Sequence, residues 1–161
     1  MLNHHTATEE EKCEICSWQY AGEYALYNVD SYETMKKKQF GFANPKMYVE
    51  AFYDGEELIG FCNLFDDGEK VFFGIGVHPR HCGKGCGKAM IEIMCGISQA
   101  LFPGKPLYLE VRTWNERAIN CYKAAGFVVD GDVIHQKTAA GDGVFYRMVR
   151  KQGDNLADIQ R

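Results

Sequence analysis

The sequence predicts an α/β (mixed α+β) domain, in which helices flank both faces of a mixed, mostly antiparallel sheet of six to seven strands. Two stretches carry this prediction. Residues 47–65 have the pattern of two strands joined by a tight turn at Asp54-Gly55-Glu56, which starts an antiparallel meander. Residues 71–112 have the pattern of strand, glycine-rich loop, helix and strand, which is a parallel, right-handed crossover. A sheet that contains both kinds of connection is mixed.

Length and composition fit one domain. The chain has 161 residues, of which 46% are apolar and 25% charged, so it can bury one core but not two. We expect a single domain over residues 1–150 and a polar C-terminal tail over residues 151–161.

Charge and hydropathy exclude several classes of partner. The net charge of −4 argues against nucleic acid, whose binding needs a basic face, and suits a cationic or amine substrate. No apolar run approaches the ~20 residues of a membrane span. The N-terminus also lacks the pattern of a signal peptide. We therefore expect a cytoplasmic protein without a membrane partner.

Seven cysteines, an odd number without a secretory signal, predict reduced thiols rather than a disulfide framework. A metal site is the alternative, because Cys13-x-x-Cys16 and Cys82-x-x-x-Cys86, with two histidines near the second pair, could supply four ligands. The first pair falls within a helical pattern, however, which favours small apolar side chains in a core. We expect no metal.

The N-terminal part is predicted from local signals. Residues 2–6 suit a short strand, and Thr8 followed by three glutamates suits an N-cap with an acidic first turn, so we expect a helix to about Trp18. Residues 35–39 suit a basic turn of helix.

A dense group of aromatic residues, interrupted by turn residues, follows the first helix. These side chains could wall a substrate pocket or pack over the core, and the sequence leaves both possibilities open. The residues assigned to an acceptor pocket are Trp18, Tyr20, Tyr24 and Tyr27. We call residues 18–28 the aromatic segment.

The central stretch is predicted to bind an anion. Residues 71–77 have the length and composition of a strand, which Pro79 ends. Glycines alternate through residues 82–87, the glycine loop, and apolar residues at helical spacing then predict a helix to about Phe102. Amides at a helix start have no intrahelical partner, and glycines let a phosphate approach them closely. The spacing fits neither the Walker loop nor the dinucleotide fingerprint.

The second half of the chain completes the sheet. Residues 107–112 alternate apolar and polar side chains, with Glu110 on the polar face. Residues 115–124 are predicted to be helical, and Gly126 ends that helix. Residues 127–134 and 144–150 are predicted to form a closing strand pair around a turn-rich segment.

The glycine loop resembles the pyrophosphate loop of the GNAT N-acetyltransferase superfamily, in which Gln/Arg-x-x-Gly-x-Gly/Ala follows a strand that ends in Val-x-Pro. The corresponding stretches are Val77-His78-Pro79 and Cys82-Gly83-Lys84-Gly85-Cys86-Gly87, with Cys82 where the family usually has Gln or Arg. A second stretch resembles the family pattern Asn-x-x-Ala-x-x-x-Tyr-x-x-x-Gly-Phe. Its matching residues are Asn115, Ala118, Tyr122, Gly126 and Phe127.

This resemblance implies the GNAT fold and transfer of an acetyl group from acetyl-CoA to a primary amine by direct attack on the thioester. It implies that loop amides hold the pyrophosphate and that the backbone of the preceding strand pairs with the pantetheine arm. The latter would explain Gly74 and Gly76, which otherwise indicate a bulge. The residues implied in acetyl-CoA binding are Ile75, Gly76, Val77, Cys82, Gly83, Lys84, Gly85, Cys86, Gly87, Lys88, Asn115 and Tyr122.

The resemblance also implies catalytic roles. In the family the tyrosine lies near the thioester sulfur, which makes Tyr122 the proposed acid. The likeness is closest to enzymes that acetylate the terminal alanine of a ribosomal protein, which carry a glutamate twelve residues before the tyrosine, as Glu110 is here. Glu110 is then the base, with Glu69 or a water relay as alternatives. His78 is expected to be an exposed strand-end residue.

The implied acceptor is a small-molecule amine or a peptide N-terminus, and the protein is expected to be a monomer or a homodimer. Two other classes stay open at this point. One is a non-catalytic acyl-CoA-binding sensor or partner-binding module, which would bind acetyl-CoA without turnover. The other is an unrelated nucleotide-binding domain, which ATP or NAD would stabilise and CoA would not.

Overall fold

The computed structural model describes residues 2–138 and 140–151. These residues form two compact units. The first comprises Met1–Phe65 and Gly74–Met90, and the second comprises Asp66–Phe73 and Ile91–Arg161. Of the predicted polar tail, residues 152–161 lie outside the described residues.

The strands of the first unit follow the order β1-β2-β3-β4. β1 (Asn3–Thr6) pairs antiparallel with β2 (Tyr48–Asp54), and β2 pairs antiparallel with β3 (Glu57–Asp66) through the predicted turn. β4 (Val71–Val77) contributes its last four residues to this unit. The predicted meander is confirmed.

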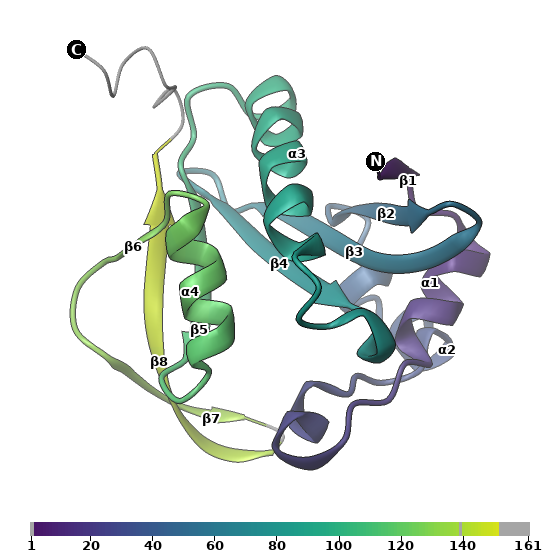
Figure 1. The fold of residues 1–161 in the computed structure, drawn as a ribbon, viewed down its shortest axis with the longest axis horizontal. Helices are drawn as coiled ribbons and strands as arrows, with labels where there is room; N and C mark the ends of the chain where they lie inside the picture. The colour runs from purple at the N-terminus through teal and green to yellow at the C-terminus, as the bar shows by residue number, and fades with distance from the viewer. Residues whose placement is uncertain (1, 139, 152–161) are drawn as a thin grey trace. The chain divides into compact units, whose positions relative to one another are not determined.

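Helices cover both faces of this part of the sheet (Figure 1). α1 (Glu9–Cys16) and α2 (Tyr32–Lys38) share a buried cluster with Val49 and Ala51 of β2. On the other face, Met90 of α3 (Cys86–Leu101) packs against Gly60 of β3. Three short 3-10 turns, η1 (Gly22–Tyr27), η2 (Gly41–Ala43) and η3 (Pro79–His81), connect these elements.

The helix ends follow from side-chain caps and from the last turn. Thr8 and Glu11 form a reciprocal capping box, in which the Thr8 Oγ1 accepts the Glu11 N–H at 3.2 Å, so the predicted N-cap is confirmed. α1 ends before Trp18 because the N–H groups of Ser17 and Trp18 bond three residues back. α2 begins three residues earlier than predicted, at Tyr32, since Ser31 caps it.

Gly74 and Gly76 of β4 have a packing reason. A Cβ at Gly74 would overlap the Asn63 carboxamide, and one at Gly76 would overlap the Phe61 ring. Both neighbours lie on β3, and Phe61 is packed edge-on against Phe42 at 5.1 Å. These glycines therefore let β4 lie beside two larger side chains, which the sequence alone could not indicate.

The second unit contains the parallel part of the sheet. β4 pairs parallel with β5 (Leu107–Arg112), and the chain between them passes through α3, so the predicted crossover is confirmed. β5 pairs antiparallel with β8 (Gly141–Arg150), and α4 (Glu116–Ala124) crosses over β5 and β8 in Figure 1. The fully buried side chains of this unit include Leu107 and Met148.

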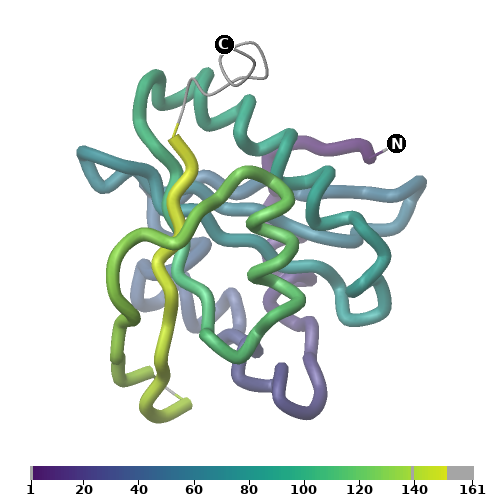
Figure 2. Tube along the Cα trace, turned by 60° about the vertical axis from the view of Figure 1, so that its left-hand side comes forward, coloured from purple at the N-terminus to yellow at the C-terminus, as the bar shows by residue number. Residues whose placement is uncertain are grey.

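The closing strand pair differs from its prediction. Of the expected strand over residues 127–134, only β6 (Val128–Val129) and the first residue of β7 (Ile134–Thr138) are in strands, and both strands are antiparallel to β8. Gly131, with a left-handed φ of 78°, lies in the break. Figure 2 shows β7 and β8 side by side, and β8 begins at Gly141, before the expected start at Val144. The mixed, mostly antiparallel sheet is confirmed, with eight strands among the described residues.

Candidate active site

The glycine loop begins where β4 ends and finishes where α3 begins. His78 caps the short turn η3, and its Nδ1 accepts the N–H of Arg80 at 3.1 Å. α3 starts at Cys86 and runs for 16 residues. The predicted order of strand, glycine loop and helix is confirmed.

The backbone of the loop leaves room for an anion. Gly83 and Gly85 have left-handed φ values of 80° and 82°, a conformation that favours glycine. A Cβ placed on either residue would meet nothing within 4 Å, so the space above both is open. The first amides of α3 have no intrahelical partner and carry the positive end of the helix dipole. The residues present therefore fit a phosphate-bearing ligand such as CoA.

The side chain of Cys82 turns back toward the strand end. Its thiol donates to the carbonyl oxygens of Val77 at 3.5 Å and His78 at 3.6 Å. The flanking Lys84 and Lys88 are exposed. Cys82 thus bonds to the backbone at the end of β4, at a position where the family usually has a longer polar side chain.

The predicted cofactor residues divide between the two units. In the first unit, β4 carries Ile75, Gly76 and Val77, which are half-buried, and the glycine loop follows. Asn115 and Tyr122 belong to the second unit, as does Glu110. The roles of both sets of residues in binding acetyl-CoA stay predictions.

His78 is half-buried rather than exposed, so the expectation for this residue was wrong. The reason is Trp18, whose indole packs edge-on against the imidazole with ring centroids 5.0 Å apart. Burial, followed by the charges of Arg80 and His81, lowers the pKa of His78 below its ordinary 6.5. His78 is therefore neutral at pH 7 and can accept the Arg80 N–H.

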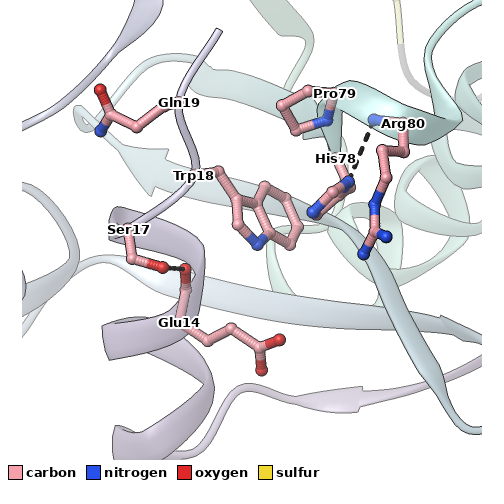
Figure 3. Close-up of a pocket in the computed structure, with 7 residues that line it drawn as sticks. All are labelled: Glu14, Ser17, Trp18, Gln19, His78, Pro79 and Arg80. Carbon is pink, nitrogen blue, oxygen red and sulfur yellow. Dashed lines mark hydrogen bonds between the residues drawn. The ribbon is translucent and has the colours of Figure 1, made fainter.

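Trp18 and His78 lie side by side in the wall of an open hollow of about 500 Å³ (Figure 3). Glu14 of α1 lines this hollow on the side of Trp18, and Arg80 of η3 lines it beside His78. The other lining residues are Ser17, Gln19 and Pro79.

The aromatic segment makes specific contacts with the end of β4. The Tyr20 hydroxyl donates to the Val77 carbonyl oxygen at 2.8 Å. Asn28 holds the backbone of Tyr20, because its Oδ1 accepts the Tyr20 N–H at 2.7 Å. Tyr24 and Tyr27 stack on each other with ring centroids 6.3 Å apart. Asn28 was missed at the sequence level, where its only signal was membership of a turn-rich stretch.

In the second unit, Asn115 and Tyr122 lie at the start and near the end of α4. Asn115 is buried and caps the helix, since its Oδ1 accepts the Ala118 N–H at 3.3 Å. The Tyr122 ring meets the Phe127 ring edge-on at 6.0 Å. Seven residues separate Asn115 from Tyr122, which is two turns, so both project from the same side of the helix.

Both oxygens of Glu110 accept hydrogen bonds. Arg147 of β8, the cross-strand partner of Glu110, donates to one oxygen at 3.1 Å, and Gln136 of β7 donates to the other at 2.6 Å. A carboxylate has about four acceptor positions, so two stay open. Glu69, the alternative base, is exposed in the turn before β4.

The sequence matches the family model described as Acetyltransferase (GNAT) family over residues 12–127. That match covers more than half of the chain, and the chain belongs to this family. It is therefore a GNAT-type N-acetyltransferase, with acetyl-CoA as its co-substrate.

Solved structures agree with this fold. Spermidine N-acetyltransferase from Vibrio cholerae, in complex with CoA and spermine, gives a TM-score of 0.77 at 20% identity over 94% of this chain and 95% of that chain. The ribosomal-protein-S18-alanine N-acetyltransferase from Escherichia coli gives 0.72 at 18% identity over 97% and 99%. No curated protein sequence matched the chain significantly.

Within residues 2–138 and 140–151, there is no group of three or more His, Cys, Asp or Glu side chains placed to hold a metal ion. Over the same part of the chain, none of the helices has the length and apolar character needed to cross a membrane.

Proposed function

We propose that this acetyltransferase moves the acetyl group of acetyl-CoA to a primary amine by direct attack of the neutral amine on the thioester. The observation that carries the proposal is the open glycine loop, with Gly83 and Gly85 left-handed at a helix start, in a chain of the GNAT family. The loop amides would hold the pyrophosphate, and the backbone of Ile75, Gly76 and Val77 would pair with the pantetheine arm.

Tyr122 is proposed as the acid and Glu110 as the base. The departing thiolate gains a proton from a hydroxyl placed beside it, and the attacking amine must lose one. The open acceptor positions on the Glu110 carboxylate suit this role, while its bond to Arg147 also suits a purely structural one. Glu69 and a water relay are the competing bases.

The proposed acceptor is a small-molecule amine or a peptide N-terminus. The net charge of −4 suits a cationic partner. The similar structures are enzymes named for spermidine and for a ribosomal-protein alanine, both of which present an amine. Trp18, Tyr20, Tyr24 and Tyr27 are the proposed lining of the acceptor pocket.

A cytoplasmic location is proposed from the cysteines, because seven of them, an odd number, suit reduced thiols. Cell fractionation tests this. The proposed oligomeric state, monomer or homodimer, is tested by light scattering.

The test of the acceptor is release of free CoA over a panel of polyamines, other amines and peptide N-termini. We expect turnover with one of these classes. If acetyl-CoA binds in calorimetry but no amine releases CoA, the protein is an acyl-CoA-binding module instead.

The test of the acid is Tyr122→Phe, which removes a hydroxyl and little volume. Turnover should fall roughly 10²-fold to 10⁴-fold, with acetyl-CoA affinity nearly unchanged. Tyr48→Phe is the control, because it also removes a bonded hydroxyl, which contacts Thr6 and Glu50. Wild-type turnover by Tyr122→Phe would remove the acid role.

The test of the base compares Glu110→Gln with Arg147→Met. Both variants break the Glu110–Arg147 ion pair, but only the first removes the carboxylate. If Glu110 is the base, the deficit of Glu110→Gln should shrink as the pH rises, because more acceptor amine is already neutral, and Arg147→Met should show no such recovery. Equal, pH-independent deficits would make Glu110 structural and favour Glu69 or a water relay.

A further inference from the structure

The carbonyl group of Val77 is the last one of β4 before the connection to the glycine loop, and a distant tyrosine holds it. The Tyr20 hydroxyl donates to this oxygen at 2.8 Å, and the Cys82 thiol donates to the same oxygen at 3.5 Å. The Cys82 thiol carries one proton and also lies 3.6 Å from the His78 carbonyl oxygen, so the Tyr20 hydroxyl is the stronger donor to Val77. The position of the strand end therefore depends on Tyr20.

Tyr20 is itself held by the aromatic segment. Asn28 accepts the Tyr20 N–H at 2.7 Å, and its amide nitrogen donates back to the Tyr20 carbonyl at 3.4 Å and to Gln19 at 3.1 Å. One side chain thus closes the segment from residue 20 to residue 28. The backbone of Tyr20 is fixed in this way, and the bond from its hydroxyl to the Val77 carbonyl links the segment to the strand end.

A second contact joins the same two parts of the first unit. Trp18 packs edge-on against His78, the residue that follows Val77, at 5.0 Å between ring centroids (Figure 3). The His78 N–H donates to the Ile59 carbonyl at 2.7 Å, which ties this point to β3. The aromatic segment is thus attached to two consecutive residues at the end of β4.

The state of the Tyr20 hydroxyl suits a permanent donor. Burial, and then the nearby Cys82, raise the pKa of Tyr20 well above its ordinary value. The hydroxyl therefore keeps its proton throughout the physiological range and can hold the carbonyl at any pH at which the protein works.

We propose that Tyr20 is a positioning residue that couples the glycine loop to the aromatic segment, so that a ligand bound in the loop changes the surroundings of Trp18. This inference rests on the proposed function, in which CoA occupies the loop and the aromatic segment borders the acceptor. A ligand that binds residues 82–87 shifts the end of β4. The hydrogen bond between Tyr20 and Val77 transmits this shift to the aromatic segment. Coupling between sites is reciprocal, so acetyl-CoA and the acceptor change each other's affinity by the same factor.

The experiment uses Trp18 as its reporter and CoA as the probe. The chain has two tryptophans, and Trp114→Phe leaves Trp18 as the single tryptophan. In this parent, CoA should change the emission of Trp18. Adding Tyr20→Phe should remove at least half of that change and weaken CoA binding in calorimetry roughly 2-fold to 10-fold, the worth of one hydrogen bond. Asn28→Ala, which frees the segment but keeps the phenol, should also remove the emission change.

Tyr48→Phe is the matched control. It removes a hydroxyl that bonds Thr6 and Glu50, and it should leave both the Trp18 response and the CoA affinity unchanged. Comparing melting temperatures separates coupling from stability, because a merely structural tyrosine would lower the melting temperature without altering the Trp18 response. If Tyr20→Phe does not fold, Asn28→Ala still tests whether the aromatic segment is coupled to the glycine loop.

The outcomes separate this inference from the proposed function. If CoA binds the parent but Trp18 does not respond, or if Tyr20→Phe keeps the full response, the coupling is wrong and the cofactor assignment stands. If calorimetry detects no CoA binding to the parent, the proposed function fails and the inference fails with it.

Discussion

The assignment of the glycine loop can be tested by one methyl group. Gly85 has a φ of 82° and open space where its Cβ would lie, so Gly85→Ala creates no clash within the protein. The cost is backbone strain of about 1–2 kcal/mol, which lowers the melting temperature of a chain of this size by roughly 2–8 °C. In the complex, however, the methyl group occupies the space that a phosphate needs.

The expected loss of affinity follows from the amide contacts. A hydrogen bond to a charged group contributes about 1.5–3 kcal/mol, so losing one amide contact weakens acetyl-CoA binding roughly 10-fold to 100-fold. At a concentration 100 times the Kd of the native protein, acetyl-CoA contributes about 2.7 kcal/mol, a thermal shift of roughly 5–11 °C. For Gly85→Ala at the same concentration, the shift should fall to roughly 1–6 °C.

Gly104→Ala is the control for strain. Gly104 has a nearly equal φ of 78°, also has open space at its Cβ, and lies after the C-terminal end of α3, whereas the loop precedes the first residue of that helix. Differential scanning fluorimetry with and without acetyl-CoA should show both variants destabilised, with the ligand shift reduced only in Gly85→Ala. A full ligand shift in a folded Gly85→Ala protein would refute the loop assignment.

Three other changes are predicted. Tyr24→Ala should raise the KM of the acceptor more than that of acetyl-CoA if the aromatic segment borders the acceptor, whereas equal effects in steady-state kinetics would indicate packing alone. The pKa of His78 is lowered, so the stability contributed by its neutral form is complete above pH 6.5 and is lost as the pH falls through the folded-state value. His78→Asn accepts the Arg80 N–H at any pH, so the melting temperature of this variant should depend less on pH between about pH 7.5 and 5.5. Burial alone would raise the pKa of Glu11, but hydrogen bonds from Tyr53, the Thr8 N–H and His5 outweigh it and lower the pKa, so this stability is present above pH 4.5 and lost below it. Glu11→Gln should be less stable at pH 7 by about 1.5–3 kcal/mol in urea unfolding and should lose less on acidification, and an unchanged acid profile would contradict this account.

The parts of the fold that the sequence predicted depend on local signals. Pro79 ends its strand because proline has no N–H to donate to a neighbouring strand. The alternating glycines indicate a loop, and the spacing of apolar residues predicts α3. Thr8 and Glu11 lie within one turn, so their capping box is also visible in the sequence. These features need no knowledge of tertiary contacts.

The parts that were missed depend on contacts between distant residues. Tyr20 and Val77 are 57 positions apart, and nothing near either residue indicates their hydrogen bond. His78 was expected to be exposed because the side chain that buries it, Trp18, belongs to a different element. The break at Gly131 was missed because a single glycine is compatible with both a bulge and a turn.

The packing of β4 against β3 has a consequence for how this chain tolerates variation. Gly76 and Phe61 fill one volume together, so the two positions should vary as a pair, and a smaller residue at position 61 should permit alanine at position 76. In a library of all single substitutions, changes at Gly74 or Gly76 should reduce the amount of folded protein, while changes at Gly83 or Gly85 should mainly reduce acetylation per folded molecule. The glycines of this strand are thus required by the size of the neighbouring side chains. Selection for the amount of folded protein will conserve them even in descendants that have lost the enzyme activity.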